Sequence, residues 1–157
     1  MGIGPSTKET TLHHFRDPLL QVVSEDDDFD CTGIIIAGIP QDNKSKYFTG
    51  ERIGAWLEAM RTDGCIVSAD SWGNSNIDFA NTIEQIGSRG IPVVGISFTG
   101  TQGAFVVSNE YMDTIVDINK SEEGIETSVV GENSMTILDA KKAAALLKLK
   151  MRQQIKD

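Results

Sequence analysis

The chain has 157 residues, of which 39% are apolar and 24% charged, and its net charge is −9. This length suffices for one domain with a buried core. The negative charge argues against non-specific nucleic-acid binding, in which Lys and Arg neutralise phosphates, and against binding to an anionic membrane surface.

No segment indicates export or membrane insertion. Residues 1–11 lack an apolar core flanked by basic residues, so we expect no signal peptide. No apolar run approaches the roughly 20 residues that span a bilayer. The two cysteines, Cys31 and Cys65, are too few for a disulfide scaffold. We therefore expect a cytoplasmic protein.

Residues 1–30 are interpreted as an N-terminal arm that ends in an acidic connector. Ser6 and Glu9 form a candidate capping box. Asp17 followed by Pro18 is typical of a helix start, because proline is tolerated at the first helical position. The acidic run 24–30 is expected to be a solvated surface loop.

Strands and helices alternate in the next part of the chain. We predict strands over 33–38, 65–69 and 93–98, each an apolar run. The first intervening helix has an apolar stripe and ends near Gly64; the stripe comprises Ile53, Trp56, Leu57 and Met60. The second starts at Asn76 and ends before Gly90; it turns Phe79, Ala80, Ile83 and Ile86 inward.

The C-terminal part is predicted to hold a short helix or turn over 103–109, strands over 114–118 and 124–130, and a helix over 138–155. One face of the last helix is expected to carry its apolar residues Ala140, Ala143, Ala144, Leu147 and Met151. Strands that alternate with helices favour parallel pairing. The predicted fold is a single α/β domain over 1–157, a three-layer sandwich with a mostly parallel four- to five-stranded sheet.

Three polar loops follow the predicted strands. Open α/β sheets bind ligands at the carboxyl ends of their strands, so we expect the loops to converge on one site. The candidate substrate- or partner-binding residues are Gln41, Asp42, Asp70, Ser71, Trp72, Asn74, Asn76, Thr99, Thr101 and Gln102. Helix starts there could also hold a carboxylate or phosphate. The alternative is that these residues only form caps and turns.

The sequence gives little evidence for a metal site or for a reactive thiol. His13 and His14 are adjacent, so they would not share a helix face, and we expect no metal site. Cys65 opens an apolar strand and is expected to be inert. Cys31 stands between the acidic run and a strand, where it is the candidate reactive cysteine.

Several segments resemble the D-proline reductase proprotein family. They are residues 2–10, 13–20, 48–61, 72–84, 90–94 and 117–127. The resemblance extends from about residue 2 to 134 and covers the C-terminal part of the longer proprotein; the chain looks most like a short accessory paralogue of it. The segment from Ile83 to Val94 is more distantly similar to the component B subunits of glycine and proline reductases.

The resemblance implies reductive ring opening of D-proline to 5-aminovalerate. In that family a pyruvoyl carbonyl activates the substrate amine and a selenocysteine of another subunit attacks. Here no cysteine stands near Trp72–Ser75, where the selenocysteine loop would lie, and Asp30 precedes Cys31. Cys31 is the candidate pyruvoyl precursor, and no other cofactor is expected.

Three hypotheses follow. The first is an accessory, non-catalytic paralogue that binds a partner subunit or a small amino acid. The second is a catalytic subunit with a pyruvoyl group derived from Cys31, and the third is a sugar- or phosphate-binding α/β module. The implied partners are other proline reductase subunits, including a selenoprotein, and a second copy of this chain in a homo-oligomer.

Overall fold

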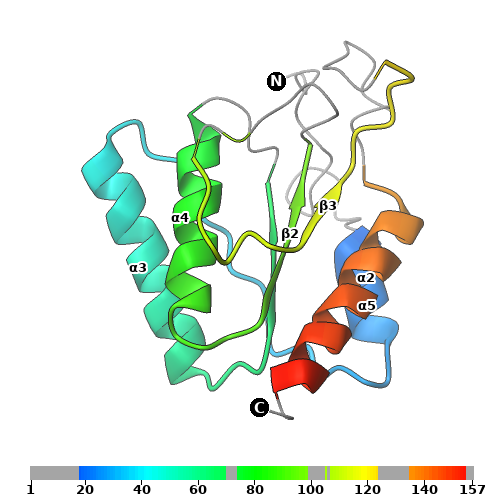
Figure 1. The fold of residues 1–157 in the computed structure, drawn as a ribbon. Helices are drawn as coiled ribbons and strands as arrows, with labels where there is room; N and C mark the ends of the chain where they lie inside the picture. Colours follow the sequence, from blue (N-terminus) through cyan, green and yellow to red (C-terminus); the bar gives the residue numbers. More distant parts are fainter. Residues whose placement is uncertain (1–17, 70–73, 99–104, 106, 124–134, 155–157) are drawn as a thin grey trace.

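The computed structural model describes residues 18–69, 74–98, 105, 107–123 and 135–154 (Figure 1). In chain order the elements are α2 (Pro18–Glu25), α3 (Asn43–Ala59), β1 (Cys65–Ser68), α4 (Ser75–Gly87), β2 (Val93–Ser97), β3 (Ile115–Asp117) and α5 (Ile137–Gln154). The predicted α/β class is confirmed, and so is the helix that begins at Pro18.

The three described strands form a parallel sheet in the order β1-β2-β3. Val67 pairs with Gly95, which in turn pairs with Ile115. All five residues of β2 are buried, as expected of a central strand covered by helices on both faces. Side chains alternate across it, so that Val94 and Ile96 join one apolar cluster while Val93 joins the other.

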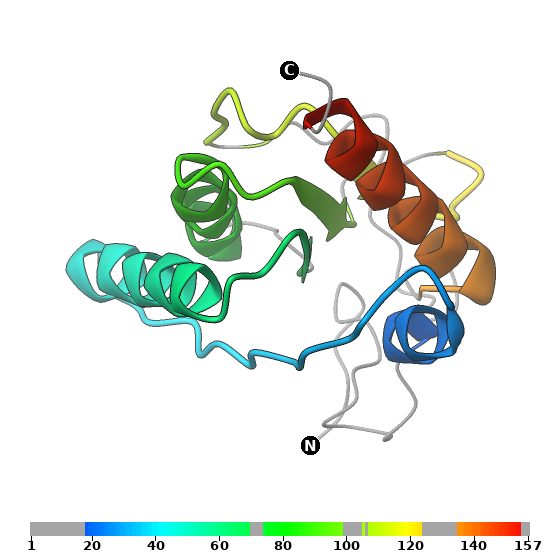
Figure 2. The ribbon, with the colours of Figure 1, turned by 90° about the horizontal axis from the view of Figure 1, so that it is seen from below.

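Helices α3 and α4 cover one face of the sheet, with α3 outermost (Figures 1 and 2). The predicted inward residues of α4 are confirmed: Phe79, Ala80, Ile83 and Ile86 are at most 2% exposed. Glycines allow α3 to approach α4 closely. A β-carbon at Gly54 would lie 2.8 Å from the carbonyl oxygen of Gln85, and one at Gly50 would overlap the amide of Asn81.

Helices α2 and α5 lie on the other face (Figure 2). Val22 of α2 packs in one cluster with the alanine face of α5 and with β2. The predicted inward residues Ala140, Ala143, Ala144 and Leu147 are buried, and Met151 is partly buried against them. The part of the N-terminal arm that the structure describes is thus packed on the domain.

The strand predicted over 33–38 is wrong. No backbone hydrogen bond joins this segment to β1 in the described structure. Ile34, Ile36 and Ile39 are more than half exposed, whereas Ile35 packs against the cluster of α3 and α4. A β-branched run favours a strand only where a partner strand and a buried face are available. The segment instead runs drawn out along the molecule from α2 to α3 (Figure 2).

Two predicted features of α3 are also wrong. The helix ends at Ala59, and Arg61, with φ of 57°, takes the left-handed conformation that was expected of Gly64. Trp56 and Met60 are 50% and 46% exposed, so they are not part of the buried stripe. That stripe consists of Lys46, Gly50, Ile53, Gly54 and Leu57.

Other predictions have mixed outcomes. Helix α4 begins at Ser75, so Asn76 lies inside it and is not its N-cap. Residues 105 and 107–109 are not helical. The strand predicted over 124–130 lies outside the described residues, so a sheet of four to five strands stays a prediction.

Candidate functional site

Strands β1, β2 and β3 point the same way, so their carboxyl ends meet at one edge of the sheet. Helix α3 precedes β1 and α4 follows it, and both helices begin at the end of the sheet where the strands end (Figure 1). The amide groups at the two helix starts therefore lie at this edge, and the convergence of the polar loops there stays a prediction.

Asp42 and Gln41 lie at the start of α3, and both are exposed. Asp42 is the N-cap: its Oδ1 accepts a hydrogen bond of 2.9 Å from the backbone N–H of Ser45. This bond holds the pKa of the Asp42 carboxyl below its ordinary value. Asp42 is thus both a cap and an accessible carboxylate at the edge.

Asn74 and Asn76 flank the start of α4 and differ in their environment. Asn74 is exposed and makes no side-chain cap bond. Asn76 is 1% exposed, and its Oδ1 accepts a hydrogen bond of 2.6 Å from the backbone N–H of Val107. Asn76 therefore holds the chain after β2 against α4, while Asn74 is available to a ligand.

The other predicted loop residues lie outside the described part of the chain. They are Asp70, Ser71, Trp72, Thr99, Thr101 and Gln102. Their role in binding stays a prediction.

A buried ion pair between α3 and α4 was missed from the sequence. Lys46 Nζ binds Asp78 Oδ2, and the side chains are 0% and 15% exposed. Asn81 stands beside this pair and donates to the carbonyl oxygen of Lys46 at 3.3 Å. The available signal was spacing: Lys46 precedes Gly50, Ile53 and Leu57 at helical intervals, which places it on the buried face.

Three buried polar atoms near this edge have no hydrogen-bond partner among the described residues. They are Ser68 Oγ at the end of β1, Asn76 Nδ2 and Asp78 Oδ1 in the first turn of α4. Buried polar groups nearly always have a partner, so these atoms retain capacity to bind water or a polar ligand.

The two cysteines have opposite environments. Cys65 is largely buried in β1, and burial raises the pKa of its thiol to about 12. It is therefore inert at neutral pH, in keeping with the prediction. Cys31 is exposed. It precedes the drawn-out segment that leads to α3, and no described hydrogen bond joins it to Gln41 or Asp42.

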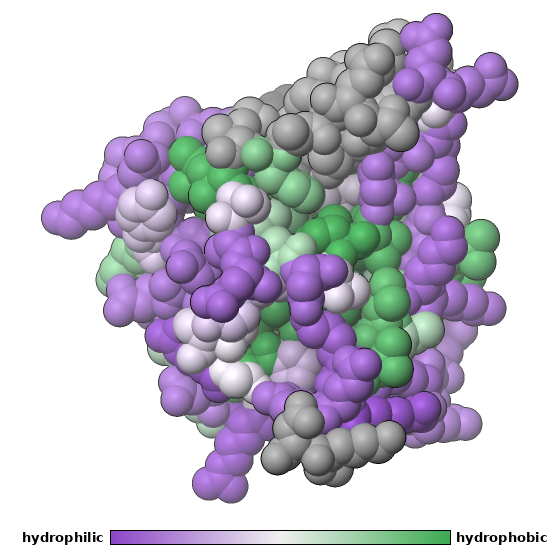
Figure 3. Space-filling view, viewed as in Figure 1, coloured by the Kyte–Doolittle hydropathy of each residue, from purple (hydrophilic) through white to green (hydrophobic). Residues whose placement is uncertain are grey.

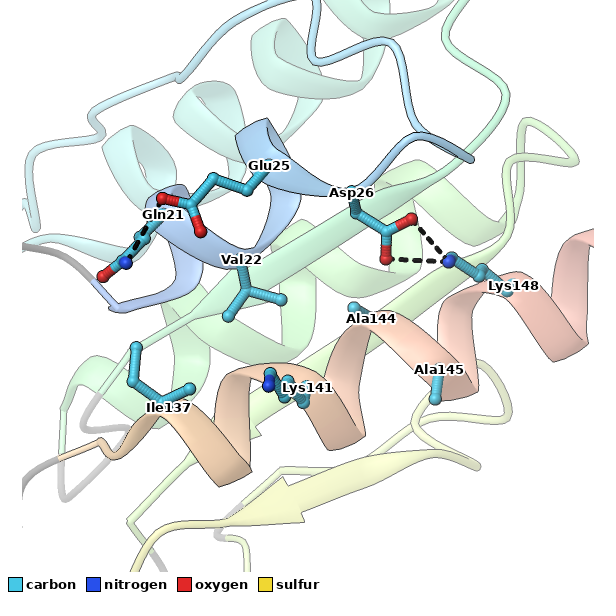
Figure 4. A pocket seen from close by; sticks show the side chains of 9 residues that line it. All are labelled: Gln21, Val22, Glu25, Asp26, Ile137, Lys141, Ala144, Ala145 and Lys148. Carbon is cyan, nitrogen blue, oxygen red and sulfur yellow. Dashed lines mark hydrogen bonds and ion pairs between the residues drawn. The ribbon is translucent and has the colours of Figure 1, made fainter.

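Two hollows lie beside α5 on the described surface. One, of about 660 Å³, lies between α2 and α5 (Figure 4). Val22 and Ala144 form its apolar floor, and Lys148 at one end binds Asp26 Oδ1 at 2.6 Å. The hydrogen bond from Lys148 holds the pKa of Asp26 below its ordinary value.

A second hollow, of about 470 Å³, lies between β3 and α5 and is lined by Ile115, Val116, Asp117, Lys142, Ala145 and Leu146. Hydrophobic side chains gather in the middle of this face of the molecule, and hydrophilic ones dominate its sides (Figure 3). Among the described residues no group of histidine, cysteine, aspartate or glutamate could hold a metal ion. His13 and His14 are not among those residues.

Comparison with known proteins settles the family. The family described as glycine/sarcosine/betaine reductase component B subunits matches residues 2–144. The chain belongs to this family. It is also 46% identical over 146 residues to the D-proline reductase proprotein PrdA of Acetoanaerobium sticklandii.

The predicted resemblance to the proline reductase proprotein is thus confirmed. The alignment covers 93% of this chain but 23% of that relative. No solved structure shows significant similarity to the chain. None of the described helices is long and apolar enough to cross a membrane.

Proposed function

We propose that the chain is an accessory component of a D-proline reductase system that binds another subunit or a small amino acid and carries no catalytic group of its own. The observation that carries the proposal is the 46% identity to PrdA across 93% of the chain. A cytoplasmic location belongs to the proposal and rests on the small number of cysteines.

The absence of a catalytic role is supported by the two sulfur groups. Nucleophilic catalysis by cysteine needs a thiolate near the substrate. The thiol of Cys65 has a pKa of about 12 and is buried in the sheet. Cys31 is exposed and precedes the drawn-out segment that leads to α3, and no described hydrogen bond joins it to Asp42 or Asn74.

A binding role is supported by the groups at that edge. The N-terminus of a helix favours a carboxylate, because unpaired N–H groups and the helix dipole both attract negative charge. Two such N-termini, of α3 and α4, lie there beside the exposed Asp42 carboxylate and the Asn74 amide. An amino acid offers the complementary carboxylate and ammonium groups.

Binding can be tested directly with purified D-proline reductase and with small ligands. We expect the chain to co-sediment with the reductase, and D-proline or 5-aminovalerate to raise its melting temperature. Asp70→Ala and Asn74→Ala should remove the thermal shift, whereas Lys141→Ala, on α5, should not. No co-sedimentation together with no shift would contradict the proposal.

The catalytic alternative is that Cys31 is the precursor of a pyruvoyl group. One observation favours it: Cys31 is exposed in a segment without helix or strand, so the preceding peptide bond is accessible. A pyruvoyl carbonyl would supply an electrophile for a substrate amine. After cleavage at residue 30, α2 would stay docked, since Val22 packs against α5 and Asp26 binds Lys148.

A sugar- or phosphate-binding module is the third possibility, and the paired helix N-termini are the observation in its favour. A thermal shift with a sugar phosphate and none with D-proline would select it. We also propose a homo-oligomer, because large apolar side chains of α3 are exposed.

A further inference from the structure

We propose that the outer face of α3 binds the same face of a second copy, with the two helices antiparallel about a two-fold axis. This inference deepens the oligomeric part of the proposed function and does not depend on the reductase role. The outer face of α3 is defined by Phe48, Glu51, Arg52, Ala55, Trp56 and Ala59.

No described helix or strand packs on this face, which is partly apolar. Phe48 is 56% and Trp56 50% exposed, although large apolar side chains usually find cover. The opposite side of the helix, with Gly50 and Gly54, is pressed against α4. Helix α3 is the outermost described element on its side of the molecule (Figures 1 and 2). The outer face of α3 is therefore open to a partner.

Arg52 stands at the centre of the face as a preorganised anchor. Its guanidinium carbon lies 5.5 Å from the centre of the Phe48 ring and 5.2 Å from that of Trp56. No described carboxylate forms an ion pair with it. An arginine held between two aromatic rings loses little side-chain entropy on binding, and arginine and tryptophan are enriched at the energetic centres of interfaces.

The face is complementary to itself in size. Phe48 lies in the N-terminal half of the face, and the small, exposed Ala55 lies in the C-terminal half beside Trp56. An antiparallel copy with Arg52 over the partner's Glu51 places Phe48 over the partner's Ala55. A two-fold axis repeats every contact, so each favourable pair of side chains occurs twice in the dimer.

The face is also complementary in charge. Glu51 lies one helical turn before Ala55 and is exposed, and no described cation is paired with it. The antiparallel arrangement brings it beside the partner's Arg52. Two Arg52–Glu51 pairs then form across the interface, between side chains that make no ion pair with the described residues of their own copy.

The expected dimer is weak. A stable interface buries about 800 Å² on each partner, which exceeds what one helix face supplies. The segment that leads into α3 adds the exposed Ile36 and Ile39. We therefore expect a reversible dimer with a dissociation constant on the order of micromolar.

Sedimentation velocity of the full chain over a range of concentrations tests the proposal. The wild type should pass from monomer to dimer as its concentration rises. Arg52→Glu and Glu51→Arg should each weaken the dimer at least about tenfold, because each places like charges opposite one another. An equimolar mixture of the two variants should recover dimers, since both cross-pairs are then opposite in charge.

Lys141→Glu, which makes the same change of charge on α5, should leave the dimer intact, and circular dichroism verifies that each variant is folded. A wild type that stays monomeric, or two variants that fail to recover dimers when mixed, would overturn the proposal. A monomeric wild type whose binding to purified D-proline reductase is lost in Arg52→Glu would assign the face to another subunit instead. The monomer–dimer equilibrium does not bear on the reductase role, which co-sedimentation tests separately.

Discussion

The helices on each face of the sheet are linked by ion pairs, and these pairs differ in how deeply they are buried. Between α3 and α4, Lys46 and Asp78 are 0% and 15% exposed and stand beside glycines that bring the helices close. On the other side, Lys148 of α5 binds Asp26 with both side chains about one quarter exposed, at 22% and 26%.

The difference indicates what each pair does. A buried pair is costly to break, because the remaining charge loses its partner in a medium that solvates it poorly. A pair near the surface contributes little, since water and salt can replace the partner. The buried pair therefore holds α3 and α4 together strongly, whereas the more exposed pair holds α2 on α5 only weakly.

The largest expected effect comes from removing the buried lysine. Lys46→Met leaves Asp78 without its cation and should lower the free energy of unfolding by about 3–5 kcal/mol. Urea denaturation measures this. Lys44→Met, on the exposed side of the same helix, should change stability by less than about 0.5 kcal/mol. Equal losses in both variants would show that the pair has no special role.

A smaller effect should follow from closing the gap between α3 and α4. In Gly54→Ala the new β-carbon would meet the backbone oxygen of Gln85 at 2.8 Å, so the helices must separate. We expect a net loss of about 2 kcal/mol, after the better helix propensity of alanine is allowed for. Gly38→Ala, with open space around it, should be close to neutral. A neutral Gly54→Ala would contradict the tight contact.

The layer of α5 has its own buried carboxylate. Asp139 receives hydrogen bonds from Thr136, and Thr136 Oγ1 accepts one from the Asp139 N–H, which forms a capping box at the start of α5. Burial acts to raise the pKa of Asp139, but the hydrogen bonds from Lys120 and Thr136 outweigh it, and the pKa is lowered.

A carboxyl with a lowered folded pKa stabilises the protein above its unfolded pKa, and this contribution is lost as pH falls through the folded value. Stability should therefore decline below about pH 4. Asp139→Ala should cost about 1–2 kcal/mol at pH 7 and flatten that decline, as measured by thermal unfolding across pH. Asp27→Ala, at an exposed position, should retain the full pH dependence.

The smallest effect is expected for the arm. Lys148→Met removes the partner of Asp26 and Asp28, so α2 should open more often while the sheet is unaffected. Hydrogen exchange should show faster exchange confined to α2, and high salt should have a similar effect on the wild type. Lys141→Met on the same helix should leave α2 protected. Faster exchange throughout the sheet would contradict the local role.

The sequence predicts the periodic elements well and the non-local contacts poorly. The apolar positions of α4 and α5 are spaced as a helix requires, and both helices pack as predicted. The segment 33–38 has the composition of a strand, but pairing depends on where β1 lies, which composition does not reveal.

The same distinction applies to the candidate site. Asp42 is recognisable as a polar residue at a helix start, whereas the Lys46–Asp78 pair joins positions 32 residues apart. Lys46 and Asp78 meet because α3 packs on α4. The common direction of the strands could be predicted from the alternation of strands and helices, but the buried charges beside their carboxyl ends could not.

The intact mass of the natively produced protein, before and after phenylhydrazine, tests the central claim most directly. The claim that this chain is a non-catalytic component predicts that no chain begins at Cys31 and that phenylhydrazine adds no mass. A fragment that starts at position 31 and gains the mass of a hydrazone would contradict it and establish a catalytic pyruvoyl subunit.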